Sequence, residues 1–148
     1  MSVTVRAVTP EDRADWGTLW GKYLSFYETS RPDDVYEETW RRIMAGENEM
    51  YSAIAVDETG RAVGITNFLY HGFFWGPEPR IYLNDLFVDP DIRGTGAGRA
   101  LIEYVEEHAQ AHGAASIYWL TAEDNVAARH LYDRIAKKSV FVHYTMPL

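Results

Sequence analysis

The pattern of apolar and polar positions predicts alternating strands and helices along the whole chain. Alternating or continuous apolar runs favour strands at about 3–8, 50–56, 61–70, 81–88, 115–120 and 140–146. Helical spacing and capping signals favour helices at about 9–27, 35–45, 98–112 and 124–137. The expected order is β-α-α-β-β-β-α-β-α-β, which indicates an α/β (α+β) fold whose sheet is mixed, part antiparallel and part parallel.

Four aromatic side chains share one face of the first predicted helix. Trp16, Trp20, Tyr23 and Tyr27 recur at spacings of four, three and four residues, which places them on one side of a helix. Core packing is the main interpretation. The alternative is that some of these rings, with Trp20, Tyr23 and Tyr27 as candidates, line a pocket for an acceptor substrate.

A second group of rings lies in the loop predicted at 71–79, between two strands. It contains Phe73, Phe74 and Trp75 together with two glycines and two prolines. A loop this rich in apolar rings is expected to pack on the domain or to cover a site. Trp75 is therefore a further candidate for contact with an acceptor.

Length and composition narrow the class of protein. The 148 residues suit one domain, 1–148, that needs no disulfide staples. The absence of cysteine excludes disulfides, thiolate metal sites and a cysteine nucleophile, and it is consistent with a cytoplasmic protein. No apolar run approaches the ~20 residues of a membrane span and no signal-peptide pattern opens the chain, so no membrane association is expected. The net charge of −8 argues against nucleic-acid binding.

The strand at 81–88 leads into a glycine-rich loop at 93–99, where the next helix begins. The loop reads Arg-Gly-Thr-Gly-Ala-Gly-Arg. A helix that begins in such a loop directs unpaired N–H groups and the positive end of its dipole at one point, where a phosphate can bind. Arg93 and Arg99 flank the loop and can pair with phosphate oxygens. An ordinary strand-to-helix connection is the alternative interpretation.

Two common phosphate-binding motifs do not fit this loop. A Walker A loop ends in Gly-Lys-Ser/Thr, whereas Gly98 is followed by Arg99. The dinucleotide-binding fingerprint requires a glycine where Arg99 stands. What remains is Arg-x-x-Gly-x-Gly behind a strand that ends in Val88-Asp89-Pro90. This pattern resembles the pyrophosphate-binding motif of the GNAT superfamily, the acetyl-CoA-dependent N-acetyltransferases.

A second block strengthens the resemblance. Asn125 and Tyr132 are seven residues apart in the sequence, so they lie on one helix face, about 10.5 Å apart along its axis. Asn followed seven residues later by Tyr, with small residues between, resembles the second sequence block of GNAT enzymes, and the order of elements also matches. The nearest likeness is to diamine acetyltransferases and to small microbial proteins resembling yeast histone- and polyamine-acetylating enzymes.

The resemblance implies a single-domain GNAT fold with about six to seven strands, acetyl-CoA as co-substrate and no metal. It also implies that the strand backbone at 86–88 pairs with the pantetheine arm and stabilises the oxyanion. Tyr132 would protonate the departing thiolate, since a phenol (pKa ~10) can donate to a thiolate whose thiol has a pKa of ~8.5. The implied cofactor-binding residues are Leu86, Phe87, Val88, Arg93, Gly94, Thr95, Gly96, Ala97, Gly98, Arg99, Asn125 and Tyr132.

Two positions depart from the family pattern. Where diamine acetyltransferases usually carry a Glu base, this chain has Asn84, which cannot accept a proton as a base. Asp85 points to the opposite face of a regular strand, although a bulge could redirect it. The candidate catalytic residues are therefore Tyr132, Asp85 and Asn84, and the base stays open between Asp85, a residue of the first helices and water. After the last helix, Ser-Val-Phe at 139–141 replaces the family's Gly-Phe, so the final strand could enter differently.

The sequence thus predicts a GNAT N-acetyltransferase that moves acetyl from acetyl-CoA to a primary amine by direct attack. The expected acceptor is a small cationic amine, a polyamine or a lysine-type amine of a protein, and a homodimer is a further expectation by analogy. One alternative is a non-catalytic acyl-CoA-binding sensor or interaction module of the same fold, which Asn84 favours and Tyr132 disfavours. Another is a phosphate-binding module for a different nucleotide.

Overall fold

A single mixed sheet forms the centre of the molecule. The computed structural model describes residues 2–92 and 95–148, so Arg93 and Gly94 of the predicted phosphate loop lie outside the described residues. The strands are β1 (Val3–Ala7), β2 (Met50–Asp57), β3 (Ala62–His71), β4 (Arg80–Val88) and β5 (Ser116–Tyr118). They lie in sequence order, β1 to β4 pairing antiparallel and β5 pairing parallel to β4. The predicted mixed α/β architecture is confirmed.

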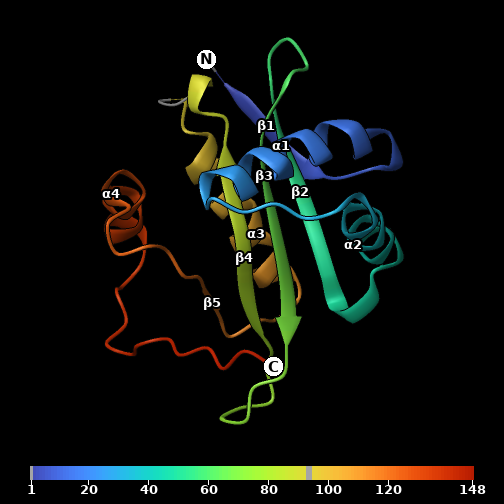
Figure 1. The fold of residues 1–148 in the computed structure, drawn as a ribbon. Coiled ribbons are helices and arrows are strands. Elements are labelled where there is room, and N and C mark those ends of the chain that lie inside the picture. Colours follow the sequence, from blue (N-terminus) through green and yellow to red (C-terminus); the bar gives the residue numbers. More distant parts are fainter. Residues whose placement is uncertain (1, 93–94) are drawn as a thin grey trace.

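Helices cover both faces of this sheet (Figure 1). The first two, α1 (Arg13–Phe26) and α2 (Asp33–Ala45), lie on one face, and α3 (Ala97–Ala111) lies on the other. The last, α4 (Val126–Ile135), stands beside the sheet, beyond β4. Three short 3₁₀ turns are η1 (Pro10–Asp12), η2 (Glu47–Glu49) and η3 (Pro90–Ile92).

The two faces of the sheet have separate cores. On the α1/α2 face, Trp16 is fully buried and packs with Ile65 and Phe87. On the α3 face, Leu83 packs with Ile102 and Val105. The buried residues of α1, α2 and α3 recur at helical spacing, which is why the pattern alone located these helices.

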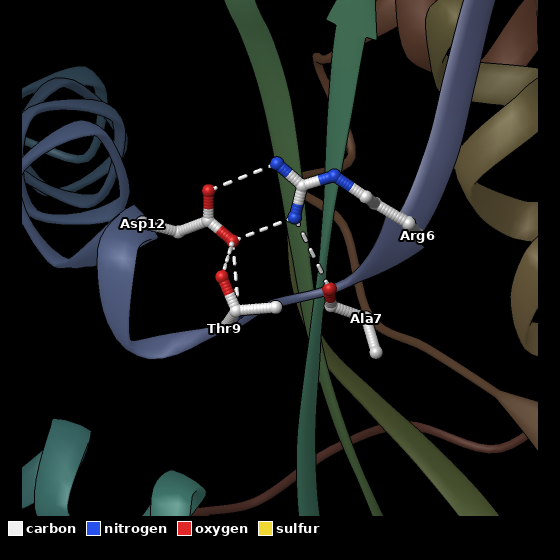
Figure 2. Close-up of polar contacts among 4 residues, drawn as sticks. All are labelled: Arg6, Ala7, Thr9 and Asp12. Carbon is white, nitrogen blue, oxygen red and sulfur yellow. Dashed lines mark hydrogen bonds and ion pairs between the residues drawn. The ribbon is translucent and has the colours of Figure 1, made fainter.

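A polar cluster fixes the entry of the chain into α1. Asp12 is buried and its Oδ2 accepts hydrogen bonds from the backbone N–H of Thr9 at 2.8 Å and from the Thr9 hydroxyl at 3.2 Å (Figure 2). The Arg6 guanidinium of β1 donates to both carboxylate oxygens of Asp12. Thr9 and Asp12 form a capping box, as the sequence predicted for a helix start at Thr9.

The strand expected at 140–146 does not form in the described chain. Over the described residues the sheet has five strands rather than the expected six to seven. After α4 the chain runs as an extended tail toward the end of the molecule where the β3–β4 loop lies (Figure 1). Val140, Phe141, Val142, Tyr144 and Met146 are all strongly exposed. The strand-like alternation is present in the sequence, but within this chain the tail has no sheet edge beside it to complete the backbone hydrogen bonds of a strand.

Among the described residues, no helix combines the length and apolarity needed to cross a membrane. The same part of the chain holds no group of three or more His, Asp or Glu side chains arranged for a metal ion.

Candidate active site

A cleft opens where β4 and β5 separate. Their pairing covers only Arg80–Tyr82 on β4 and Ser116–Tyr118 on β5. Beyond it lies a cleft of about 410 Å³, within the usual range for small-molecule sites. It is lined by residues of α1, β4, the start of α3, the end of β5 and α4, namely Tyr23, Phe26, Tyr27, Leu83, Asn84, Leu86, Phe87, Val88, Thr95, Gly96, Ala97, Gly98, Arg99, Trp119, Leu120, Thr121, Asn125, Ala127, Ala128, Leu131, Tyr132 and Arg134.

The wall formed by β4 offers an unpaired strand edge. The Asp89 N–H donates to the Val63 carbonyl of β3 at 2.8 Å. Because successive N–H groups of a strand point to opposite sides, those of Val88 and Leu86 point away from β3, toward the separating β5. This wall can therefore donate hydrogen bonds to an extended ligand in the cleft.

The end wall is the N-terminus of α3. Gly96 is its N-cap residue, with φ of 79°, a left-handed conformation that glycine adopts without steric cost. The first bond of the helix runs from the Ala100 N–H to the Gly96 carbonyl at 2.9 Å. The N–H groups of Ala97, Gly98 and Arg99 consequently have no partner within the helix, and all three residues line the cleft. This end of the cleft can hold an anion.

The opposite wall carries Asn125 and Tyr132, the N-cap residue and a central residue of α4. The Asn125 side chain donates to the Thr121 hydroxyl at 3.2 Å. The Tyr132 ring packs against Trp119 with a centroid distance of 5.3 Å, and within the described chain its hydroxyl has no hydrogen-bond partner. Burial raises the pKa of Tyr132 to about 12, so the phenol is protonated at neutral pH.

The remaining end of the cleft is aromatic. Tyr23 and Phe26 come from the last two turns of α1, and Tyr27 follows them. The Tyr23 and Tyr27 rings are 5.1 Å apart. Burial, followed by the negative charge of Asp85, raises the pKa of both phenols. The helix face predicted from sequence thus divides, with Trp16 and Trp20 in the core and the two tyrosines at the cleft.

A β-bulge separates the roles of Asn84 and Asp85. The register of β4 against β3 runs Phe68 opposite Leu83 and then Asn67 opposite Asp85, so Asn84 is the extra residue. Asn84 is exposed to the cleft, and the Asp85 carboxylate lies on the α1/α2 face, 9 % exposed. The predicted bulge is present, and it turns Asp85 away from the face that Leu83 occupies.

The structure gathers most of the predicted site residues around the cleft, with five exceptions. Asp85, a predicted catalytic residue, does not line the cleft. Trp20 is buried in the core and Trp75 is 87 % exposed in the β3–β4 loop, and neither lines the cleft. These two acceptor candidates are therefore wrong. Ring spacing cannot distinguish a core ring from a cleft ring, and the loop expected to pack on the domain or cover a site leaves Trp75 exposed. Arg93 and Gly94 lie outside the described residues.

Several lining residues escaped the sequence reasoning. Trp119, Leu120 and Thr121 follow β5, and their only signal was their position at the end of a strand predicted to run parallel to its neighbour. Leu131 and Arg134 of α4 also line the cleft.

The cleft thus combines an unpaired strand edge, an anion-binding end and a protonated phenol, and the fold of the chain can be compared with those of known proteins. The model of the Acetyltransferase (GNAT) family matches residues 15–136 of this chain. A D-amino-acid N-acetyltransferase of Saccharomyces cerevisiae, HPA3, is 36 % identical over 143 residues, which are 96 % of this chain and 89 % of the relative. Aminoglycoside N(6')-acetyltransferase type 1 of Stenotrophomonas maltophilia is 29 % identical over 150 residues, covering 98 % and 94 % of the two chains.

Solved structures agree on the fold. AAC(6')-Iy, in complex with the bisubstrate analog CoA-S-monomethyl-acetylneamine, superposes with a TM-score of 0.85 over 100 % of this chain and 99 % of its own, at 19 % identity. The chain belongs to the GNAT family of N-acetyltransferases. Acetyl-CoA is accordingly its acetyl donor, as the resemblance of its sequence motifs to the GNAT superfamily implied.

Proposed function

We propose that this GNAT enzyme acetylates the primary amine of a small molecule by direct attack on the acetyl group. One observation carries the proposal. The separation of β4 from β5 places an unpaired strand edge and the Tyr132 phenol on opposite walls of one cleft, which ends against Tyr23 and Tyr27. A small amine can therefore enter from the aromatic end while the donor occupies the rest of the cleft.

The cleft residues fit acetyl-CoA. The free N–H groups at the start of α3, from Ala97 to Arg99, suit a pyrophosphate. The edge of β4 at 86–88 suits the amide groups of the pantetheine arm. Asn125, opposite this edge, would hydrogen-bond the same arm. Arg99 pairs with Glu103 at 2.9 Å on the surface, and it can exchange this exposed partner for a phosphate.

Two groups would assist the transfer. Bound acetyl-CoA supplies an acetyl group whose thioester bond is weak enough for an amine to displace. The N–H of Leu86 or Val88 would stabilise the negative charge that develops on the carbonyl oxygen. Tyr132 would give its proton to the departing sulfur, which the protonation of this phenol at neutral pH allows.

Asp85 is the proposed base for the acceptor amine. Its carboxylate does not line the cleft, whereas the neighbouring Tyr23 does, and the Tyr23 hydroxyl lies 3.5 Å from the Asn84 carbonyl. An ammonium proton would pass to the Tyr23 hydroxyl once that hydroxyl turns from the Asn84 carbonyl, to which it donates, and gives its own proton to Asp85. The neutral amine then attacks the carbonyl carbon, the carbon–sulfur bond breaks, and Tyr132 protonates the sulfur. The proton that the attacking nitrogen loses as the amide forms restores the Tyr132 phenol. Asn84 would not act as a base. Its backbone carbonyl would accept a hydrogen bond from Tyr23, and its side chain would be exposed to the cleft.

The experiment follows free thiol release from acetyl-CoA with a panel of amines. The panel holds D-amino acids and aminoglycosides, which the names of the two relatives suggest, together with L-amino acids, polyamines and a lysine peptide. Amine-dependent release with a small molecule, and transfer of the acetyl group to its nitrogen by mass spectrometry, is the expected result. Release with the lysine peptide alone would overturn the small-molecule proposal. Tight acetyl-CoA binding with no amine-dependent release would instead support an acyl-CoA-binding module.

We also propose that the enzyme is a homodimer joined through the tail at 140–146. Each chain carries an unpaired strand-like segment with exposed apolar side chains, and a short β5 whose pairing covers three residues. Two copies related by a twofold axis can satisfy both features at once, because each would offer its edge to the tail of the other.

A further inference from the structure

A chain of four side chains joins the core of the α1/α2 face to the carboxylate of Asp85. The Trp16 indole N–H donates to the Asn67 Oδ1 at 3.2 Å. The Asn67 Nδ2 donates to the Asp85 Oδ2 at 2.9 Å, and the Asn84 Nδ2 donates to the Asp85 Oδ1 at 2.8 Å. The chain thus crosses from α1 through β3 to β4.

The Trp16 indole, at the buried end of this series of hydrogen bonds, determines which groups donate and which accept. Trp16 is fully buried, and an indole nitrogen can only donate. Asn67 must therefore present its oxygen to Trp16, which leaves its NH₂ group to face Asp85. Each oxygen of Asp85 consequently receives one amide donor, an arrangement that favours the charged form of a carboxylate.

In the part of the protein that the structure describes, no cationic side chain pairs with the Asp85 carboxylate. Asp85 takes part in no ion pair there, although it is buried, with only 9 % of its surface exposed. The titratable groups that face it are phenols, from Tyr23 and Tyr27 on the α1 side and from Tyr82 on its own strand, and its charge contributes to the raised pKa of all three. The amide donors are therefore its main compensation for burial.

We propose that Asn67 is a positioning residue, oriented by Trp16, which fixes the orientation of the Asp85 carboxylate so that Asp85 can receive the acceptor's proton. The proposal rests on the role of Asp85 given above. Asn67 itself does not line the cleft, so it acts through Asp85 and not on the substrate. Loss of its hydrogen bond would leave the buried Oδ2 of Asp85 without its amide donor and the carboxylate without its fixed orientation.

The test compares Asn67→Leu and Trp16→Phe with a matched control, Trp20→Phe. Trp20 lies one turn further along α1 and stacks on Trp16 at 5.2 Å. Its indole nitrogen is buried, with no partner among the described residues. The control therefore removes an equivalent N–H and an equivalent volume without touching the chain of hydrogen bonds. Asp85→Asn measures how much kcat/KM falls when the proposed base itself is removed.

Two readouts separate a positioning role from a structural one. The first is the pH dependence of kcat/KM with the best amine of the panel. The second is the ¹³Cγ resonance of Asp85 followed against pH, assigned by its absence in Asp85→Asn, which needs no turnover. Asn67→Leu should move the acid limb and the carboxyl titration about one unit toward higher pH, the size expected for one hydrogen bond to a charged group. Trp16→Phe should move both in the same direction by less, and Trp20→Phe should move neither.

The outcomes are distinct for the two proposals. A titration of Asp85 in Asn67→Leu that coincides with that of the wild type would overturn the role of Asn67. An equal shift in Trp20→Phe would overturn it too, because the effect would then follow from packing. Unchanged kcat/KM in Asp85→Asn would reject Asp85 as the base, while the carboxyl titration would still decide whether Asn67 holds it. If Asn67→Leu does not fold, the comparison of Trp16→Phe with Trp20→Phe decides the proposal.

Discussion

The guanidinium of Arg6 binds both carboxylate oxygens of Asp12, with nitrogen–oxygen distances of 2.7 and 3.0 Å. Asp12 also accepts two hydrogen bonds from Thr9. The hydrogen bond from Arg6 is the main cause of the lowered pKa of Asp12, and burial opposes it. One buried carboxylate therefore ties β1 to the first turn that precedes α1.

We expect Asp12→Ala to lower the free energy of unfolding by about 1–2 kcal/mol at neutral pH, since it removes a helix cap and hydrogen bonds to a charged group. A carboxyl with a lowered pKa in the folded state stabilises the protein above its unfolded pKa, ordinarily 3.8 for Asp. This contribution is lost as the pH falls below that value. Urea unfolding at pH 7 and near pH 3 measures both effects, and the difference between the variant and the wild type should narrow at the lower pH. Asp15→Ala is the control, since the Asp15 side chain is exposed and has no hydrogen bond among the described residues. An equal loss in the control would contradict the assignment.

Tyr132→Phe should separate catalysis from cofactor binding. Removal of a proton donor to the leaving sulfur should lower kcat by about 100-fold or more, while the Kd for acetyl-CoA changes only a few-fold because the ring remains. Since the pKa of Tyr132 is raised to about 12, ionisation of this phenol should not reduce the wild-type kcat below about pH 10. Timed assays of thiol release give kcat, and calorimetry gives the Kd for acetyl-CoA.

Tyr104→Phe provides the control for that experiment. Tyr104 is partly buried on α3, and burial raises its pKa as well, but it does not line the cleft. Its loss of a hydroxyl should leave kcat unchanged. Equal losses of kcat and of cofactor affinity in Tyr132→Phe would reject the acid role.

Gly96→Val should strongly weaken the binding of acetyl-CoA. Gly96 adopts a left-handed φ of 79° and lines the cleft at the start of α3, so a branched side chain both strains the backbone and occupies the space where the ligand would approach. Gly60→Val is a matched control, because Gly60 has a φ of 86° in the β2–β3 turn and an added Cβ has no neighbour within 4 Å at either position. Both variants should lose similar stability. Calorimetry should show a Kd raised at least about tenfold in Gly96→Val alone, and unaltered binding there would mean that the start of α3 is not the phosphate site.

Much of this site could be predicted because its signals are local. A glycine-rich loop after a buried strand, and Asn125 seven residues before Tyr132, are short patterns whose geometry follows from helix and strand periods. The bulge at Asn84 was harder, because it depends on the register of β4 against β3, which is set by pairing between residues far apart in sequence. For the same reason the sequence left open which face Asp85 occupies.

Other errors arose where a periodic pattern has two explanations. The stripe on α1 combines core residues with cleft residues, and spacing cannot distinguish them, so Trp20 was grouped with Tyr23. The alternation at 140–146 is that of a strand, but a strand also requires a partner edge. The pattern indicates that the segment can form a strand. It does not indicate which polypeptide chain supplies the strand edge that pairs with it.

The tail gives the last prediction. If 140–146 pairs with a second copy, the wild type should elute as a dimer, with twice the monomer mass by light scattering, because six exposed apolar side chains between Val140 and Leu148 would be withdrawn from water in each copy. Val140→Asp combined with Val142→Asp should release monomers, since both charges would lie in the new interface. Lys137→Glu changes the net charge of the tail by the same amount before the apolar stretch and should leave the dimer intact. A wild type that is monomeric at all concentrations tested, or a dimer that survives the double substitution, would reject the tail as the interface.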